Sequence, residues 1–195
     1  MNTQPFLRTA LLVLCALLVG CLPESRNPIA SPRDSFLDAR LEGAWAARDG
    51  SGPFDYYHFQ HKKTAPWMRI VGVSPNETKG LSVVTYDALS ARIGSQTYLS
   101  FRAISEDTTA VHAAFSFARY DFDWLGRLRI YPLVSETELA DAVRTGKLRG
   151  TVKGTRSSPT VKLTDTSSRI AAFIAASDAK GLFNSDPMVM RKVKM

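Results

Sequence analysis

The middle of the chain consists of short segments in which polar and apolar residues alternate, separated by clusters of turn residues. In residues 67–74, for example, Met68 and Ile70 occupy one set of alternate positions, and Arg69 and Val71 occupy the other. Alternation with a period of two, rich in β-branched and aromatic residues, is typical of half-buried strands. It predicts strands over residues 43–45, 56–62, 67–74, 81–86, 97–104, 113–124, 127–133, 149–155 and 160–163. Residues 88–94 follow no pattern that assigns them.

Two helices are expected in the later part of the chain. Ser135 and Glu138 have the spacing of a capping box at a helix start, and Gly146 is placed to end that helix. Asp165 is expected to cap a second helix, which would end at Gly181. Both helices would pack on the strands because each has an apolar stripe.

About eight antiparallel strands with one or two packed helices predict a mainly β fold. The simplest arrangement is a closed barrel or a strongly curved sheet, because closure removes exposed strand edges. A β-sandwich is the alternative. The 195 residues provide one domain of ordinary size, and the 45% hydrophobic content excludes a chain that is disordered throughout.

The first residues have the features of a secretory signal. Arg8 precedes a wholly apolar run over residues 10–19, which is far shorter than the ~20 residues of a transmembrane helix. The run ends in Leu18-Val19-Gly20-Cys21, and this box resembles the processing site of a bacterial lipoprotein. The resemblance implies removal of residues 1–20 and lipidation of Cys21, as with palmitate. A signal peptide cut at a nearby small residue, or a signal anchor that stays uncut, is the alternative.

The lipoprotein resemblance also predicts a location. Cys21 would be the sole cysteine of the mature chain, and residues 21–34, with three prolines among polar residues, are expected to form a flexible tether. A single domain over residues 35–187 and a basic tail over residues 188–195 would follow. Leu22 stands where aspartate favours the inner membrane in Gram-negative lipoproteins. The resemblance therefore implies the bacterial cell envelope, with a lipid anchor in the outer membrane and the domain facing the periplasm.

The first predicted strand has a second resemblance. Gly43-Ala44-Trp45, after a short apolar turn, resembles the opening of the lipocalin and calycin group. In that group the glycine admits close packing and the tryptophan seals the barrel floor, so Gly43 and Trp45 are expected to have structural roles. An arginine near the last strand stacks on the tryptophan in that group, and Arg169 is the candidate here. The resemblance supplies no binding residue.

The net charge of +7 favours an anionic neighbour. Arg149 and Lys153 lie on one face of a predicted strand, with Arg156 just beyond it, and we interpret these three residues as a candidate surface for anionic material. Behind a lipoprotein signal the available anions are lipid head groups, lipopolysaccharide or cell-wall polymer, and nucleic acid is not expected. A merely solvated face explains the same residues.

No catalytic constellation is recognisable. His58 and His61 point to opposite faces of a strand, which disfavours a metal pair, and His112 is isolated. Asp121 and Asp123 share a strand face at a spacing that would suit paired acid and base roles, but ion pairs with the flanking arginines explain them better. The glycines of residues 146–154 lack the rest of a phosphate-binding loop. We therefore expect no catalytic residue, metal or cofactor.

Two classes of function stay open from the sequence. The first is a lipid-anchored, non-catalytic domain that binds an apolar or amphipathic ligand inside its barrel, or an anionic envelope component. The second is a protein-interaction or assembly accessory module that uses its outer surface, and an envelope hydrolase is a third class with less support. An open interior around Trp45 would favour ligand binding, whereas an interior filled by aromatic side chains would favour the module.

Overall fold

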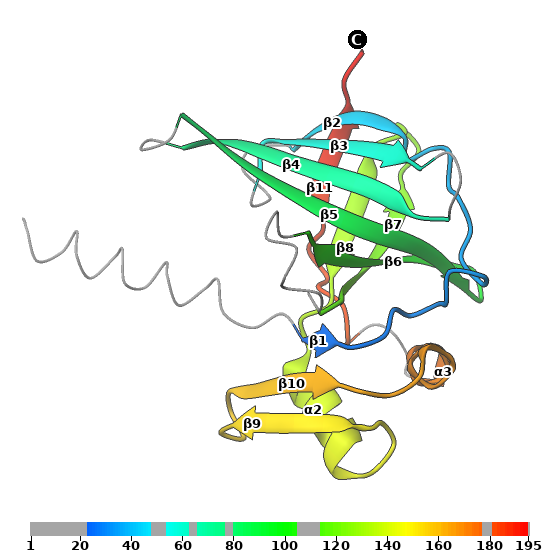
Figure 1. Ribbon diagram of the computed structural model, residues 1–195, viewed down its shortest axis with the longest axis vertical. Helices are drawn as coiled ribbons and strands as arrows, with labels where there is room; N and C mark the ends of the chain where they lie inside the picture. The colour runs from blue at the N-terminus through cyan, green and yellow to red at the C-terminus, as the bar shows by residue number, and fades with distance from the viewer. Residues whose placement is uncertain are drawn as a thin grey trace, which may run out of the picture.

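The structure is a computed structural model that describes residues 23–47, 54–62, 66–76, 80–104, 114–176 and 181–194. Eight strands form a closed antiparallel barrel, and three strands form a small separate sheet (Figure 1). The predicted mainly β barrel is confirmed, and the β-sandwich alternative is wrong. In chain order the elements are β1 (Glu24–Ser25), β2 (Gly43–Ala47), β3 (Tyr56–His61), β4 (Met68–Asn76), β5 (Gly80–Ile93), β6 (Gln96–Ala103), β7 (Ser116–Phe122), β8 (Leu128–Pro132), α2 (Glu136–Arg144), β9 (Gly150–Gly154), β10 (Pro159–Leu163), α3 (Ser167–Ala176) and β11 (Met188–Lys192).

The barrel runs in the order β11-β2-β3-β4-β5-β6-β7-β8 and is closed by its last strand. Met190 of β11 lies opposite Ala47 of β2 on one side and Leu128 of β8 on the other. The prediction of a basic tail over residues 188–195 is therefore wrong for Met188–Lys192. Met188 and Met190 supply the inward apolar positions that a closing strand needs, and Met190 is fully buried.

Alternate residues of the barrel wall enter two different hydrophobic cores. On β6, Leu99 belongs to the core inside the barrel, whereas its neighbour Tyr98 belongs to a second core outside it. The second core also contains residues of α2, α3 and β10, such as Leu139, Ile170 and Val161. The helices and the small sheet thus form an accessory layer on one side of the barrel, below it in Figure 1.

The two cores explain the part of β5 that the pattern leaves unassigned. Ala88, Leu89, Ser90 and Ala91 are consecutive and all buried. Because the accessory layer covers the outer wall here, both faces of the strand are buried and the alternation of polar and apolar residues disappears. Residues 81–86 and 88–93 are one continuous strand, Gly80–Ile93.

The start of the described chain is packed against the domain. Pro23 is buried, Glu24–Ser25 pair in parallel with β10, and Ser25 also bridges to Phe115. Ile29 is 1% exposed in the second core, and its N–H donates to Ser100 Oγ at 2.9 Å. The flexible tether predicted over residues 21–34 is therefore wrong from residue 23 onward.

Both predicted helices form, but their starts differ from expectation. Ser135 is at the N-cap position of α2, yet its side chain makes no capping hydrogen bond, so the predicted capping box is wrong. At α3 the carbonyl of Thr166 accepts the N–H of Ile170 at 3.0 Å, which makes Thr166 the cap rather than Asp165. Gly146, with φ of +74°, follows the end of α2 as expected.

Candidate functional site

The three-stranded sheet, in the order β1-β10-β9, has one buried face and one solvent face. On β10, Val161 and Leu163 are buried in the second core with Leu139 of α2, whereas Thr160 and Lys162, at the alternate positions, are exposed. Apolar and polar residues thus alternate with the period of a strand that is covered on one side. The helix leaves the opposite face of the sheet open to solvent.

A tight turn joins β9 to β10 and fixes their register. Gly154 has φ of +83°, and a Cβ atom at this position would lie 2.4 Å from the carbonyl oxygen of Ser158, so only glycine fits. Thr155 Oγ1 accepts the N–H of Ser158 at 3.2 Å. Arg156 is exposed in this turn. Lys153 lies directly opposite Thr160, which places its side chain on the solvent face.

The predicted cationic residues gather at this sheet. Arg149 comes just before β9, Lys153 lies on it and Arg156 follows it, and all three are exposed. None of them forms an ion pair with another residue that the structure describes. Lys162 adds a cation that the sequence pattern does not single out. Its Nζ atom lies 3.5 Å from Glu24 Oε2, and both side chains are exposed. We define these four cations as the cationic sheet face.

Asp165 holds the end of this sheet to α3. Its side chain is buried, with Oδ2 accepting the N–H of Arg149 and Oδ1 accepting the N–H of Thr166, each at 2.9 Å. Arg169 Nε lies 3.2 Å from Oδ2. Burial raises the pKa of Asp165, but these hydrogen bonds and the charges of the two arginines outweigh it and leave the pKa below its usual range.

The chain enters the domain at this sheet. Glu24 pairs in parallel with Lys162, and Ser25 pairs with Leu163. Cys21, the predicted lipidation site, lies outside the described residues, two positions before Pro23.

Trp45 closes the barrel at one end. It is 1% exposed, and its Nε1–H donates to the carbonyl of Leu41 at 2.7 Å. Its ring centre lies 5.9 Å from that of Phe122. Gly43 has φ of +115° and leaves room for the side chain of Lys192, whose Nζ atom is 5.4 Å from the Trp45 ring. This end of the barrel is filled by its own side chains.

Two expectations for this end are corrected by the structure. Arg169, expected to stack on Trp45, lies on α3 with its guanidinium on Asp165. Lys192 of β11 is the cation over the tryptophan instead. Sequence reasoning missed it because residues 188–195 were assigned to a tail rather than to the closing strand, in which Lys192 lies opposite Trp45.

A buried carboxylate joins the segment before β2 to the barrel wall. Asp38, 6% exposed, accepts two hydrogen bonds from the Arg40 guanidinium, at 2.6 and 2.8 Å, and one from the Tyr120 hydroxyl at 3.0 Å. Burial raises the pKa of Asp38, but the hydrogen bonds outweigh it and leave the pKa lowered. Both carboxylate oxygens of Asp38 are thus paired, and the group ties this segment to β7.

The inward-facing residues nearer the other end of the barrel are less completely covered. Tyr86 and Phe101 point into the barrel, edge to face at 5.9 Å, and both are only half-buried. Tyr57, opposite Trp45 on the neighbouring strand, is 7% exposed. Its hydroxyl makes no complete hydrogen bond within the described residues, although the Phe54 backbone is near enough to act on its pKa. Burial raises the pKa of this hydroxyl, so it stays protonated and remains a hydrogen-bond donor.

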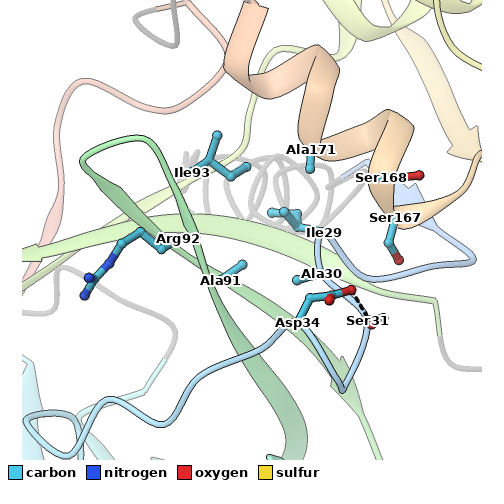
Figure 2. A pocket seen from close by; sticks show the side chains of 10 residues that line it. All are labelled: Ile29, Ala30, Ser31, Asp34, Ala91, Arg92, Ile93, Ser167, Ser168 and Ala171. Atoms are coloured by element: carbon cyan, nitrogen blue, oxygen red, sulfur yellow. Dashed lines mark hydrogen bonds between the residues drawn. The ribbon is translucent and has the colours of Figure 1, made fainter.

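A pocket of about 190 Å³ lies outside the barrel, between the β5–β6 hairpin, residues 29–34 and the start of α3 (Figure 2). The Ser167 and Ser168 hydroxyls line one side, and Asp34 accepts a hydrogen bond from Ser31 at 2.6 Å on the other. Arg92 points away from α3 (Figure 2), and its guanidinium lies 5.0 Å from the Phe36 ring centre. The polar groups here do not converge on a single point, and we assign no chemistry to this pocket.

The carboxylates considered for acid and base roles are ion-paired. Asp121 pairs with Arg129 at 2.5 Å, and Asp123 pairs with Arg127 at 2.6 Å. The interpretation of these residues as cross-strand ion pairs is confirmed.

The histidines and acidic residues assemble no metal site within the described ranges. His58 is exposed on β3, and His61 Nδ1 lies 3.5 Å from Glu42 Oε2. His112 lies outside the described residues. A search of the described part of the chain for helices long and apolar enough to cross a membrane found none.

The fold and the site define a class: an eight-stranded antiparallel barrel with a cationic three-stranded side sheet. Comparisons of the chain with protein-family models, with the curated proteins and with solved structures found no match. Any function must therefore be argued from the residues themselves.

Proposed function

We propose that this protein is a bacterial envelope lipoprotein, anchored by lipid on Cys21, whose non-catalytic barrel domain holds the cationic sheet face against anionic lipid head groups. The observation that carries the proposal is the pairing of β1 with β10, which brings the start of the domain beside Lys162. The signal-like residues 1–20 and the cysteine that follows them support the anchor. Leu22, in place of aspartate, supports an outer-membrane location facing the periplasm.

Chain length sets how far the domain could stand from its anchor. Pro23 is already buried in the fold and follows Cys21 by only two positions, and an extended chain covers about 3.6 Å per position. The linker therefore spans at most about 7 Å. This is shorter than the Debye length of about 8 Å at physiological ionic strength, so charges beside β1 would feel the membrane surface.

The charge of the sheet suits an anionic surface. Lys153 and Arg156 have no ion-pair partner within the described part of the chain, so no neighbouring carboxylate offsets their attraction to head groups, whereas Arg149 lies beside Asp165. Each basic residue near an anionic bilayer contributes about 1 kcal/mol. Such a surface would strengthen a lipid anchor, because one acyl chain alone binds reversibly.

The proposal is tested by vesicle binding of the unlipidated chain from residue 22 onward, which retains the packed residues 23–34. We expect binding to vesicles that contain phosphatidylglycerol, little binding to phosphatidylcholine alone, and release by salt. The double substitution Lys153→Glu and Arg156→Glu should weaken binding by about 30-fold or more, since two favourable contributions of about 1 kcal/mol are lost.

A matched control distinguishes the effect of the cationic sheet face on binding from the effect of the net charge of the protein. Arg33 and Arg69 are exposed residues outside the small sheet. Their double substitution to glutamate changes the net charge equally, and it should weaken binding much less. Equal losses for the two double variants, or no binding by the unsubstituted chain, would reject the cationic sheet face as the membrane-binding surface.

A second candidate function is the binding of an amphipathic molecule inside the barrel, and the Tyr57 hydroxyl favours it. A buried hydroxyl without a partner costs free energy unless a water or ligand completes its hydrogen bond. The half-buried Tyr86 and Phe101 would provide an apolar wall beside it. Trp45, which lies opposite Tyr57 on the neighbouring strand, would bound such a ligand on one side.

A further inference from the structure

The tip of the hairpin between β7 and β8 exposes two large apolar side chains. Trp124 is 88% exposed and Leu125 is 55% exposed, and Trp124 is the most exposed of the large apolar side chains that the structure describes. The two other tryptophans differ from it, because Trp45 is 1% exposed and Trp67 is partly buried beside Phe115. An exposed tryptophan beside an exposed leucine is the kind of apolar projection that marks an interaction site.

This tip is held in a single conformation by the residue before it. Asp123 Oδ1 accepts the N–H of Leu125 at 2.9 Å and the N–H of Arg127 at 3.0 Å, while Oδ2 pairs with Arg127 Nε. Gly126, with φ of +73°, donates to the Asp123 carbonyl at 2.9 Å. These hydrogen bonds order the backbone of the turn, so the turn itself needs no ordering on binding and keeps Trp124 and Leu125 at the tip of the hairpin.

Cations gather at the same end of the barrel. β11 runs antiparallel to β8, with Met190 opposite Leu128, so residues 191–194 extend past the start of β8 toward this end. Arg191, Lys192 and Lys194 are exposed there, where the C-terminal segment projects beyond the barrel in Figure 1. Asp123 is neutralised by its ion pair with Arg127. The apolar tip therefore has cationic neighbours, as an anionic lipid surface requires.

The tip lies far from the point where the chain enters the domain. Ser25 bridges to Phe115 at the start of β7, and the tip follows the end of that strand. Trp124 follows Phe115 by nine positions, and a strand rises about 3.3 Å per residue, so the two points are about 30 Å apart along β7. An anchor at Cys21 and a contact at Trp124 would thus hold the domain at two separate points.

We infer that the Trp124-Leu125 tip inserts into the interfacial region of the bilayer that carries the anchor, so that the domain lies along the membrane. This inference rests on the membrane attachment proposed above. Two side chains are too small a surface for a standard protein partner, which covers about 800 Å² on each side. Their insertion alone is weak, but an anchor on the same molecule makes it intramolecular and raises the effective concentration of lipid.

The test uses the full protein as purified from membranes and reconstituted in vesicles of phosphatidylcholine and phosphatidylglycerol. Lipids brominated in the acyl chain quench a tryptophan that enters the bilayer. We expect quenching of the fluorescence contributed by Trp124, together with loss of its access to aqueous acrylamide. Trp124→Phe should remove the quenched component, because Trp45 and Trp67 stay inside the fold. Intact mass measured on the same sample shows whether Cys21 carries lipid.

Each outcome decides between this inference and the proposed anchor. If a lipid adduct is present and Trp124 stays open to acrylamide, the tip inference is overturned and the anchor stands. If no adduct is present and Trp124 is still quenched, the anchor is wrong and insertion of the tip stands. If the protein carries no lipid adduct and Trp124 is not quenched, both the anchor and the insertion of the tip are overturned. Clustering of vesicles that Trp124→Ala abolishes would show the tip reaching a second bilayer, and it would overturn the inferred contact with the anchoring one.

Discussion

Replacing Trp45 with alanine should be among the most destabilising single changes in this protein. The side chain is 1% exposed, packs on Phe122 inside the barrel and lies under Lys192 of the closing strand. Its removal would leave a cavity where β2, β7 and β11 meet. Replacing a fully buried tryptophan with alanine costs about 3–5 kcal/mol in the free energy of unfolding.

Part of this cost belongs to one hydrogen bond, which a second variant isolates. The indole N–H of Trp45 donates to the Leu41 carbonyl at 2.7 Å. Trp45→Phe keeps an aromatic ring but leaves this buried carbonyl without a donor, a loss of about 1–3 kcal/mol. We therefore expect Trp45→Phe to lie between the wild type and Trp45→Ala in stability.

Urea unfolding followed by circular dichroism measures these differences, and thermal unfolding gives a second estimate. A change of 1 kcal/mol shifts the Tm of a domain of this size by about 2–4 °C, so Trp45→Ala should lower the Tm by about 6–20 °C. The matched control is Trp124→Ala, at an 88% exposed tryptophan, which should change stability by no more than about 0.5 kcal/mol. Similar losses at the two positions would refute the assignment of Trp45 to the barrel core.

Two further predictions concern buried polar groups. Because the pKa of Asp165 is lowered in the folded state, its contribution to stability should be complete above the unfolded pKa of about 3.9 and should be lost as the pH falls through the folded value. Asp165→Asn should thus be less stable than the wild type at neutral pH, and the two proteins should become equally stable in acid. Urea unfolding measures both stabilities from neutral pH to acid. A difference in the free energy of unfolding that did not change with pH would contradict the ion pairing. Tyr57→Phe should leave the ligand-free protein as stable or more stable, because it removes an unpaired buried hydroxyl, whereas Tyr120→Phe should destabilise it by removing the bond to Asp38. Destabilisation by Tyr57→Phe in protein shown by native mass spectrometry to be ligand-free would indicate a partner for this hydroxyl.

The barrel could be predicted from the sequence because most of its strands have one face inside and one in water. β3 shows this plainly, since Tyr57 and Phe59 are buried and Tyr56 and His58 are exposed. The second half of β5 could not be predicted, because its outer face is covered by the accessory layer and carries no polar signal. Residues 23–34 could not be predicted because they are held by few apolar residues, such as Ile29, within polar sequence. The apolar start of β11 is too short to stand out before the basic residues that follow Met190.

The candidate site was only partly visible from the sequence. The alternation of Arg149 and Lys153 indicated a cationic strand face, but Lys162 belongs to the same face only through pairing in the sheet. The proximity of β1 to this face could not be read from local pattern, because it depends on a pairing between Glu24 and Lys162, far apart along the chain. The exposure of Trp124 could not be predicted either, because it depends on the turn that the hydrogen bonds of Asp123 hold in place.

The closing strand places a constraint on how this protein can be made. Residues 190–192 of β11 pair with residues 45–47 of β2, so the barrel cannot close until the chain has been made through residue 192. Contacts this distant in sequence slow folding, and until they form β2 and β8 each expose an unpaired edge. A chain that stopped before β11 would therefore form an open and aggregation-prone sheet rather than a slightly shorter barrel.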